Sequence, residues 1–287
     1  MTAALLSLIA SVAWGASDFL GGLASRRARL PLVLAGSQVA GLVALGPALA
    51  IAGQPLPPDP RLLWGLAAGV LAAGTLGLIY VALRRGPVMV MAPIAALAAL
   101  LPVAIGIVGG DRVDLLIAAG IACALAGAVA ASWVPGGEWP PLREALIGGA
   151  VAGGAAAGTG AALSLLDWAS KASAWWALGA LRVGGSVTAV LLLAALVLTR
   201  SGATARLSAG AALMIAAVGL SDAGADAAFA NATRDGALSV VAVLSSLYPV
   251  TTIALGAVVL RERPRRVQLA GAGLACLGVA VLAWTTA

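Results

Sequence analysis

The ionisable residues Asp18, Arg182, Asp222 and Asp226 lie inside long apolar stretches of this chain of 287 residues. An aspartate or arginine at the centre of a membrane span costs about 2.5–3.5 kcal/mol, so each side chain should face the protein interior or water. Asp222 and Asp226 are four residues apart and share one face of a helix. An ion pair of Arg182 with one or both would remove the cost, which is the structural interpretation. Proton coupling or binding of a substrate ammonium is the functional alternative.

Asp18 lies one helical turn from Trp14 and has no evident charged partner in the sequence. It is therefore the better candidate for a group that binds a proton or a cation, and its alternative role is to snorkel to the membrane boundary. Trp14, Tyr80 and Tyr248 are the aromatic residues that lie deepest in the apolar stretches. Because aromatic faces attract cations, we include these three residues, together with the three aspartates, in a predicted substrate site.

Pro102 and Pro249 interrupt apolar stretches at matching places in two similar segments. Proline has no amide hydrogen and clashes with the carbonyl four residues before it, so the carbonyls of Ala98 and Ser245 would be freed near the middle of a bilayer. Paired breaks of this kind are typical of a substrate site or a hinge. A kink that serves packing alone is the alternative. Pro102, Ser245 and Pro249 complete the predicted substrate site.

The elements that must position these residues are membrane-spanning helices. Hydrophobic residues make up 62% of the chain and charged residues 10%, whereas roughly a quarter of the residues of soluble domains are charged. Apolar runs of about 20 residues, the length needed to cross a bilayer, follow one another along the chain. We predict an all-α polytopic membrane protein with ten transmembrane helices, at residues 3–24, 31–52, 62–83, 88–109, 113–134, 144–168, 174–199, 207–231, 237–260 and 266–285.

The chain consists of two related halves. The pattern Leu-Xaa-Xaa-Leu-Xaa-Pro-Val at residues 97–103 returns at residues 244–250. Further residues recur at a constant offset of 151, which relates Gly120, Gly127 and Trp133 to Gly271, Gly278 and Trp284.

A segment rich in proline and glycine, residues 134–143, separates the halves, which we place at 1–139 and 140–287. Each half holds five predicted spans. Because five is odd, the second half must enter the membrane in the opposite sense, and the halves form two inverted five-helix repeats. Such repeats in an apolar chain are typical of a secondary transporter.

Basic residues predict the orientation, because Lys and Arg collect in cytoplasmic loops. Twelve arginines lie in loops after odd-numbered spans, whereas only four basic residues, Arg61, Arg112, Lys171 and Arg234, follow even-numbered spans. The loops after odd-numbered spans should therefore be cytoplasmic, and both termini should lie outside.

Several classes of protein and site are disfavoured. The chain has no histidine, and no serine–base pair or metal cluster can be assembled from it, so we expect neither an enzyme nor a metal site. It has no Gly-rich loop with the Lys that binds nucleotide phosphates, and we expect no ATP and no cofactor. The net charge of +6 resides in short loops rather than on a basic face, so we expect no nucleic-acid partner.

Four short motifs of this chain are found together in one known family. They are Ala-Trp-Gly-Ala-Ser-Asp-Phe at residues 13–19, residues 242–250, the turn Leu-Arg-Glu-Arg at 260–263 and Gln-Leu-Ala-Gly at 268–271. With them the chain resembles the drug/metabolite transporter (DMT) superfamily, in the branch built from two EamA repeats. The first half departs from the family at its turn, where Asp111-Arg112 replaces Glu-Arg, and the sixth span has no Trp-Gly motif. The resemblance implies ten helices, alternating access and transport of small organic solutes, often outward.

We therefore expect a secondary transporter that exports small polar or amphiphilic metabolites, such as amino-acid-like solutes, by alternating access. The alternative is a proton-coupled multidrug antiporter for lipophilic cations, with Asp18 as the coupling residue in either case. We expect it to act as a monomer in the lipid bilayer, as a multi-pass protein of the plasma membrane, or of the inner membrane if it is bacterial. Its partners are then the small-molecule substrate and, in the coupled mode, a proton.

Overall fold

The computed structural model describes residues 2–85, 96–133, 141–199, 207–261 and 263–285. These residues form helices only and no strand. The helices are α1 (Thr2–Ser25), α2 (Leu30–Ala52), α3 (Leu62–Arg85), the 3-10 helix η1 (Ala96–Ala99), α5 (Leu100–Val108), α6 (Leu115–Ser132), α7 (Leu142–Ser170), α8 (Ala174–Thr199), α9 (Ala209–Asp235), α10 (Leu238–Ser245), α11 (Tyr248–Val259) and α12 (Arg266–Thr285).

Seven described segments are long and apolar enough to cross a membrane. They are α1, α2, α6, α7, α8 up to Leu198, α9 and the segment Leu238–Val259, which joins α10 and α11. Three shorter apolar helical segments, Leu62–Leu76, Leu97–Val108 and Arg266–Leu282, lie within the remaining predicted spans. The prediction of an all-helical, multi-pass membrane protein is confirmed.

Local sequence explains where several helices begin and end. The carboxylate of Asp114 accepts a hydrogen bond from the amide of Ile117 at 2.8 Å and caps α6. The hydroxyl of Ser208 does the same for α9, with the amide of Ala211 at 3.2 Å. These side chains satisfy amides that have no partner within the helix. Gly53 ends α2 with a φ of 60°, a conformation that glycine adopts at no steric cost.

The ninth predicted span is broken rather than kinked. α10 ends at Ser245 and α11 begins at Tyr248, with Pro249 in its first turn. Pro102 occupies a similar place, as the third residue of α5 directly after the 3-10 helix η1. A proline in the first turn of a helix removes an amide that would have no partner there in any case. Each proline therefore marks the start of the second helix of a broken span.

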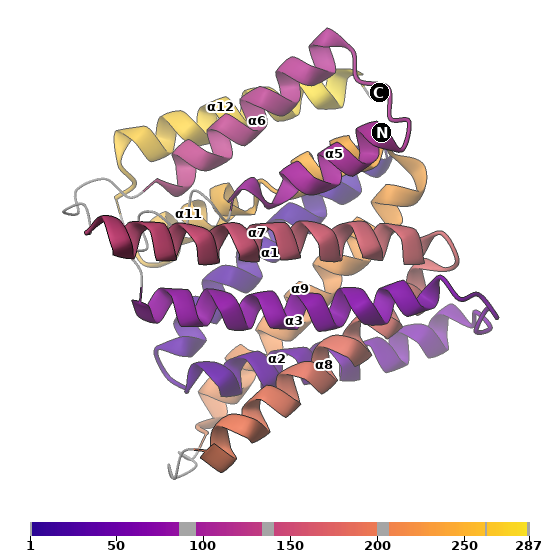
Figure 1. The fold of residues 1–287 in the computed structure, drawn as a ribbon, viewed down its shortest axis with the longest axis vertical. Helices are drawn as coiled ribbons and strands as arrows, with labels where there is room; N and C mark the ends of the chain where they lie inside the picture. Colours follow the sequence, from indigo (N-terminus) through magenta and orange to yellow (C-terminus); the bar gives the residue numbers. More distant parts are fainter. Residues whose placement is uncertain (1, 86–95, 134–140, 200–206, 262, 286–287) are drawn as a thin grey trace.

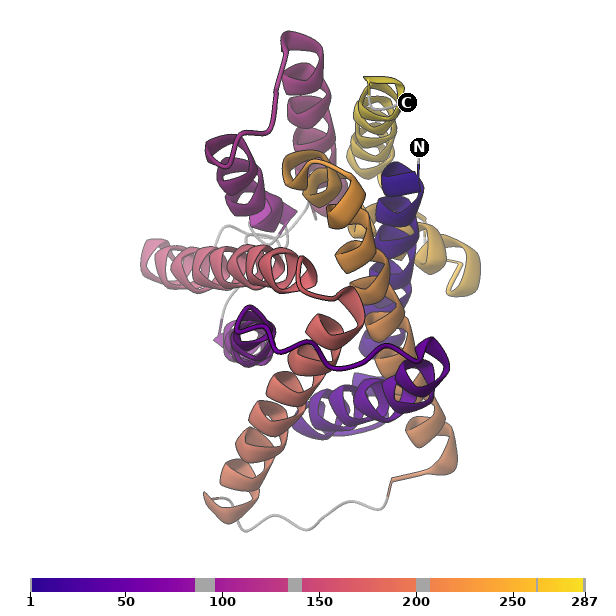
Figure 2. The ribbon, with the colours of Figure 1, turned by 90° about the vertical axis from the view of Figure 1, so that its right-hand side faces the viewer.

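Helices α6 and α12 pack side by side (Figures 1 and 2). A Cβ atom on Gly127 would overlap the backbone of Ala275, and one on Gly278 would overlap the backbone of Ala124. The pairing runs in opposite directions along the two helices, so they are antiparallel. Glycines let two helix backbones approach this closely. The two contacts are related by the same offset of 151 residues that relates the two halves of the sequence.

A second pair of close contacts joins the two halves. α1 crosses α11 at Gly15, where an added Cβ would lie 2.7 Å from the carbonyl oxygen of Tyr248. α7 crosses η1 and α5 at Gly160, where an added Cβ would lie 3.0 Å from Cδ of Pro102 and would overlap the carbonyl of Ala98. The first helix of each half thus packs against the broken span of the other half.

Helices α1 and α9 run together through the middle of the molecule (Figure 1). We define the outer end as the end where α1 begins and where α5, α7 and α9 end; in the orientation that the arginines predict it is extracytoplasmic. Near that end the packing is dense: Leu166 of α7 and Phe229 of α9 are 0% exposed. They belong to one apolar cluster with residues of α1, α3, α8 and α10, here called the outer core.

Candidate functional site

Arg182 of α8 is fully buried and lies against two carboxylates of α9. Its Nη1 donates to Oδ2 of Asp222 at 2.7 Å, and its Nη2 donates to Oδ2 of Asp226. The spacing of four residues on α9 places both acceptors on the same face, where one guanidinium reaches both. One arginine therefore compensates two aspartates inside the bundle.

Trp14 of α1 extends this network to a third helix. Its indole ring lies beside the carboxylate of Asp226, close enough to interact with it. Its ring also contacts the ring of Phe229, with the centroids 5.8 Å apart and the planes tilted by 44°. The sequence places Trp14 next to Gly15, and the absence of a side chain at Gly15 brings α1 close to α11. The Trp-Gly pair thus fixes α1 against both α9 and α11.

Asp18 lies one turn along α1 from Trp14, and its side chain is exposed. It lies close enough to Asp222 and to Tyr248 for electrostatic interaction with both. Its carboxylate makes no hydrogen bond or ion pair with any residue that the structure describes. Arg182 pairs with Asp222 and Asp226, and Asp18 lies near Asp222, so these four residues at the crossing of α1, α8 and α9 carry more negative than positive charge. This group is here called the central cluster.

Two polar atoms beside the central cluster have no partner among the described residues. They are Nε of Arg182 and Oγ of Ser186, which lie four residues apart on α8 and are both buried. A buried donor or hydroxyl without a partner costs about 1–3 kcal/mol, so such groups usually bind water or a ligand. The sequence indicated Arg182 as an ionisable residue within a span, whereas nothing in it distinguishes Ser186 from other serines.

The remaining predicted site residues lie at helix crossings. Oγ of Ser245 is 3.4 Å from the carbonyl oxygen of Ser7, to which it donates, and its side chain is fully buried between α10 and α1. Pro102 is buried against α7, and Pro249 is half-buried at the start of α11. The backbone of Tyr80 belongs to α3, but its side chain lies outside what the structure describes.

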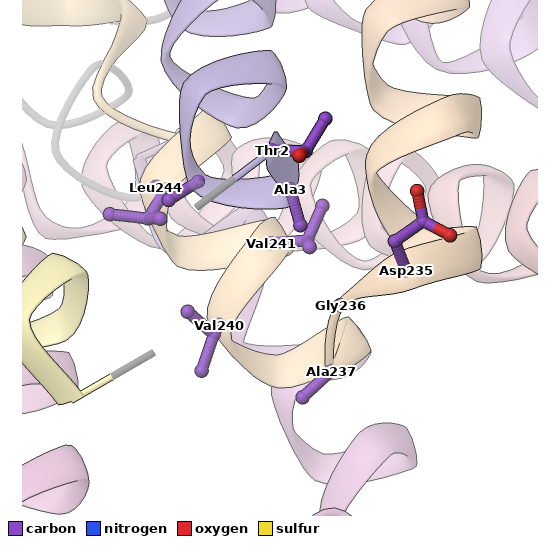
Figure 3. Close-up of a pocket in the computed structure, with 9 residues that line it drawn as sticks. Thr2, Ala3, Asp235, Gly236, Ala237, Val240, Val241 and Leu244 are labelled. Carbon is purple, nitrogen blue, oxygen red and sulfur yellow. The ribbon is translucent and has the colours of Figure 1, made fainter. Parts of the chain in front are cut away.

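Two cavities lie at the outer end, on either side of the turn between α9 and α10, and Gly236 lines both. The first has a volume of about 410 Å³ and is bounded by the start of α1 and by α10. Figure 3 shows that Asp235 is the charged residue of its lining, in which Thr2 adds a hydroxyl and the other labelled residues are apolar. The second has a volume of about 490 Å³ and contains Asp111, Asp167 and Lys171.

Asp167 was not among the predicted site residues, although it lies inside the sixth predicted span. Its side chain is 3% exposed and pairs with Nζ of Lys171 at 3.3 Å. Its place in an apolar stretch was the signal that should have included it with the other ionisable residues. Among the described residues, no group of three His, Cys, Asp or Glu side chains is arranged to hold a metal ion.

Comparison with known proteins adds the family and the fold. The model of the EamA-like transporter family matches residues 1–133 and again residues 146–284. A solved crystal structure of a protein superposes on the chain with a TM-score of 0.81; it covers 97% of this chain and 95% of its own, at 21% identity. That likeness shows a common fold. No curated protein sequence matches the chain significantly.

Proposed function

The chain belongs to the EamA-like transporter family, and on that premise we propose that it is a ten-helix secondary transporter that exports small polar or amphiphilic metabolites with an amino group. The observation that carries the proposal is the central cluster, in which Arg182 pairs with Asp222 and Asp226 while a third carboxylate, that of Asp18, lies near Asp222. An excess of carboxylates within a membrane favours a cationic partner, either a substrate ammonium or a proton. The family consists of membrane transporters, which accords with a role in transport rather than catalysis.

Two inverted five-helix repeats, residues 1–139 and 140–287, supply the alternating access. Support comes from the antiparallel packing of α6 and α12, in which the contact of Gly127 with Ala275 has a counterpart in that of Gly278 with Ala124. An interface whose two halves are equivalent is what a two-fold relationship between repeats requires. The crossings at Gly15 and Gly160 let each repeat rock against the broken span of the other.

Asp18 is the residue that binds the substrate ammonium or the coupling proton. Arg182 holds Asp222 and Asp226 in ion pairs, whereas Asp18 has no such partner among the described residues. Its exposed side chain lies beyond the closely packed outer core, which favours a conformation in which the cluster is open toward the cytoplasm. Export then requires the outer core to open and the inner half to close.

The alternative function is antiport of protons against lipophilic cations. Trp14 and Tyr248 favour it, because both lie next to carboxylates of the central cluster and aromatic faces bind organic cations. In both modes the transporter acts as a monomer in the plasma membrane, or in the inner membrane if it is bacterial, without a cofactor.

Purified protein in proteoliposomes distinguishes these functions. We expect radiolabelled amino acids or other primary amines to exchange across the membrane, while their deaminated analogues of equal size do not. Transport of tetraphenylphosphonium driven by a pH gradient, without transport of any amino-acid-like solute, would support the antiporter instead. Absence of both activities across a panel of metabolites would contradict the proposed function.

A further inference from the structure

The second outer cavity, of about 490 Å³, has the chemistry of a binding site. Residues of α5, α7, α9 and α10 line it, and its polar and aromatic lining consists of Asp111, Asp167, Trp168, Lys171 and Thr233. In the predicted orientation it faces the extracytoplasmic side. It lies apart from Asp18, which is on the inner half of α1.

Asp167 is held in a fixed position at the wall of this cavity. Its carboxylate forms an ion pair with Nζ of Lys171 at 3.3 Å and lies near the hydroxyl of Thr233. Lys171 is 53% exposed, so its ammonium can turn away from Asp167 toward solvent or toward a ligand. The buried partner is therefore the carboxylate, and the mobile partner is the cation.

Asp111 brings a second carboxylate to the cavity. Its Oδ2 accepts a hydrogen bond from the amide of Ser239 at 2.9 Å, at the start of α10. Asp111 and Asp167 lie close enough for mutual repulsion. With Lys171 as the counter-charge, the lining carries one negative charge more than positive. Two carboxylates around one cavity repel each other, and a second cation would relieve the repulsion that Lys171 leaves.

Trp168 adds a surface that suits an organic cation better than a metal ion. Trp168 lines the cavity and is partly exposed, and its ring contacts that of Trp64, with the ring centroids 6.1 Å apart in an edge-to-face arrangement. An ammonium group binds to an aromatic face when it is also paired with carboxylates. A hard metal ion would prefer an all-oxygen shell.

The cavity adjoins the packed layer above the central cluster. Ile105 and Leu238 line it and also contact the outer core, which contains Phe229. On α9, Thr233 lies on the same helix face as Phe229 and Asp226, at spacings of four and three residues. A solute released past Phe229 would therefore enter this cavity.

From this arrangement we propose that the cavity of Asp111, Asp167 and Trp168 is a second binding site, on the extracytoplasmic side, for small organic ammonium compounds. Its place on the transport path rests on the proposed function, whereas the binding itself does not. The ammonium group lies between Asp111 and Asp167 against the Trp168 ring, and it displaces Lys171 from Asp167.

The test measures protection of a cysteine in the cavity and requires no transport. The natural Cys123 and Cys276 are replaced by alanine, and Ala104, an exposed residue of the cavity wall, by cysteine. We expect phenethylamine at four times its dissociation constant to slow the reaction of this cysteine with N-ethylmaleimide about fivefold. The neutral isostere 2-phenylethanol should leave the rate unchanged.

Charge variants in the same background decide the assignment. Asp111→Asn and Asp167→Asn are made as two separate variants, and Asp111→Asn keeps an oxygen for the amide of Ser239. Each should raise the phenethylamine concentration needed for protection about tenfold. Lys171→Gln should lower it, because a competing cation is removed. Asp235→Asn, in the neighbouring cavity, is the matched control and should not change it. Each variant is checked for folding by gel filtration and circular dichroism.

Equal protection by the alcohol, or protection unaffected by both Asn variants, would overturn the proposal. If phenethylamine no longer protects the cysteine in either Asn variant, but Lys171→Gln has no effect, the ligand does not displace Lys171 from Asp167. Transport in proteoliposomes is measured separately. If the protein transports amines but phenethylamine does not protect the cysteine, the proposed function stands and only this site is ruled out. If phenethylamine protects the cysteine but no amine is transported, the site stands and the proposed function is ruled out.

Discussion

Nη1 of Arg182 lies 2.7 Å from Oδ2 of Asp222 and joins α8 to α9 inside the bundle. The arginine is 0% exposed and the aspartate side chain 28% exposed, so the cation is the more buried partner. Together with the bond from Arg182 to Asp226, this contact gives two of the three central carboxylates a positively charged partner. The third, Asp18, is left to bind a proton or a substrate ammonium.

Replacing Arg182 should destabilise the protein strongly. Arg182→Leu leaves two aspartates without a counter-charge, and breaking a buried ion pair in this way costs about 3–5 kcal/mol. The fraction folded in detergent after heating is the measurement. Arg61→Leu is the control, since it breaks an exposed pair with Asp59 that is 2.6 Å long and worth about 0–1 kcal/mol. Equal loss of stability in both variants would contradict a structural role for Arg182.

Glycines of α1 should differ sharply in their tolerance of a methyl group. At Gly15 an added Cβ would lie 2.7 Å from the carbonyl oxygen of Tyr248, whereas at Gly22 no atom lies within 4 Å. Gly15→Ala should therefore destabilise by about 1–3 kcal/mol, as overpacking does. Gly22→Ala should leave stability unchanged or raise it slightly. Melting temperatures in detergent check both, and a tolerated Gly15→Ala would argue against the close crossing of α1 and α11.

Pro249→Ala should impair transport more than stability. The proline is in the first turn of α11, where its missing amide has no helical partner, so alanine changes stability by less than about 1 kcal/mol. Alanine also allows α10 and α11 to join into one helix, which removes the break between them. Transport rate is compared with melting temperature. Pro31→Ala, at the corresponding place in α2, is the control and should leave both unchanged.

Much of this fold could be predicted from the sequence, and the reasons are local. Apolar runs predicted the helices because a span must satisfy its own backbone, and Pro249 indicated the break between α10 and α11. The spacing of Asp222 and Asp226 was enough to assign them one helix face. Gly160 could not be recognised as the counterpart of Gly15, because Thr159 precedes it where Trp14 precedes the other.

Contacts between helices that lie far apart in the sequence could not be predicted. The sequence does not show that Asp18 of α1 lies near Asp222 of α9, since 204 residues separate them. Nor does it show that Asp111, between α5 and α6, approaches Asp167 at the end of α7. These pairs form only when helices from both halves cross, and no local pattern records such a crossing.

The orientation of the chain is tested by labelling. The arginine distribution predicts that a cysteine at Arg263 faces the cytoplasm and that one at Asp59 faces outside. In intact cells a membrane-impermeant maleimide should therefore label the cysteine at 59 and not that at 263, in a background without natural cysteines. Labelling of position 263 alone would reverse the topology and would place the second outer cavity on the cytoplasmic side.

The central claim is that Asp18 carries the coupling charge, and transport by Asp18→Asn in proteoliposomes tests it most directly. We predict that this variant loses uptake driven by a pH gradient but keeps substrate exchange, which needs no net proton movement. Glu144→Gln, an exposed residue in the first turn of α7, is the matched control and should retain both activities. Full gradient-driven uptake by Asp18→Asn, with its loss in Asp222→Asn or Asp226→Asn, would contradict the account and assign coupling to α9.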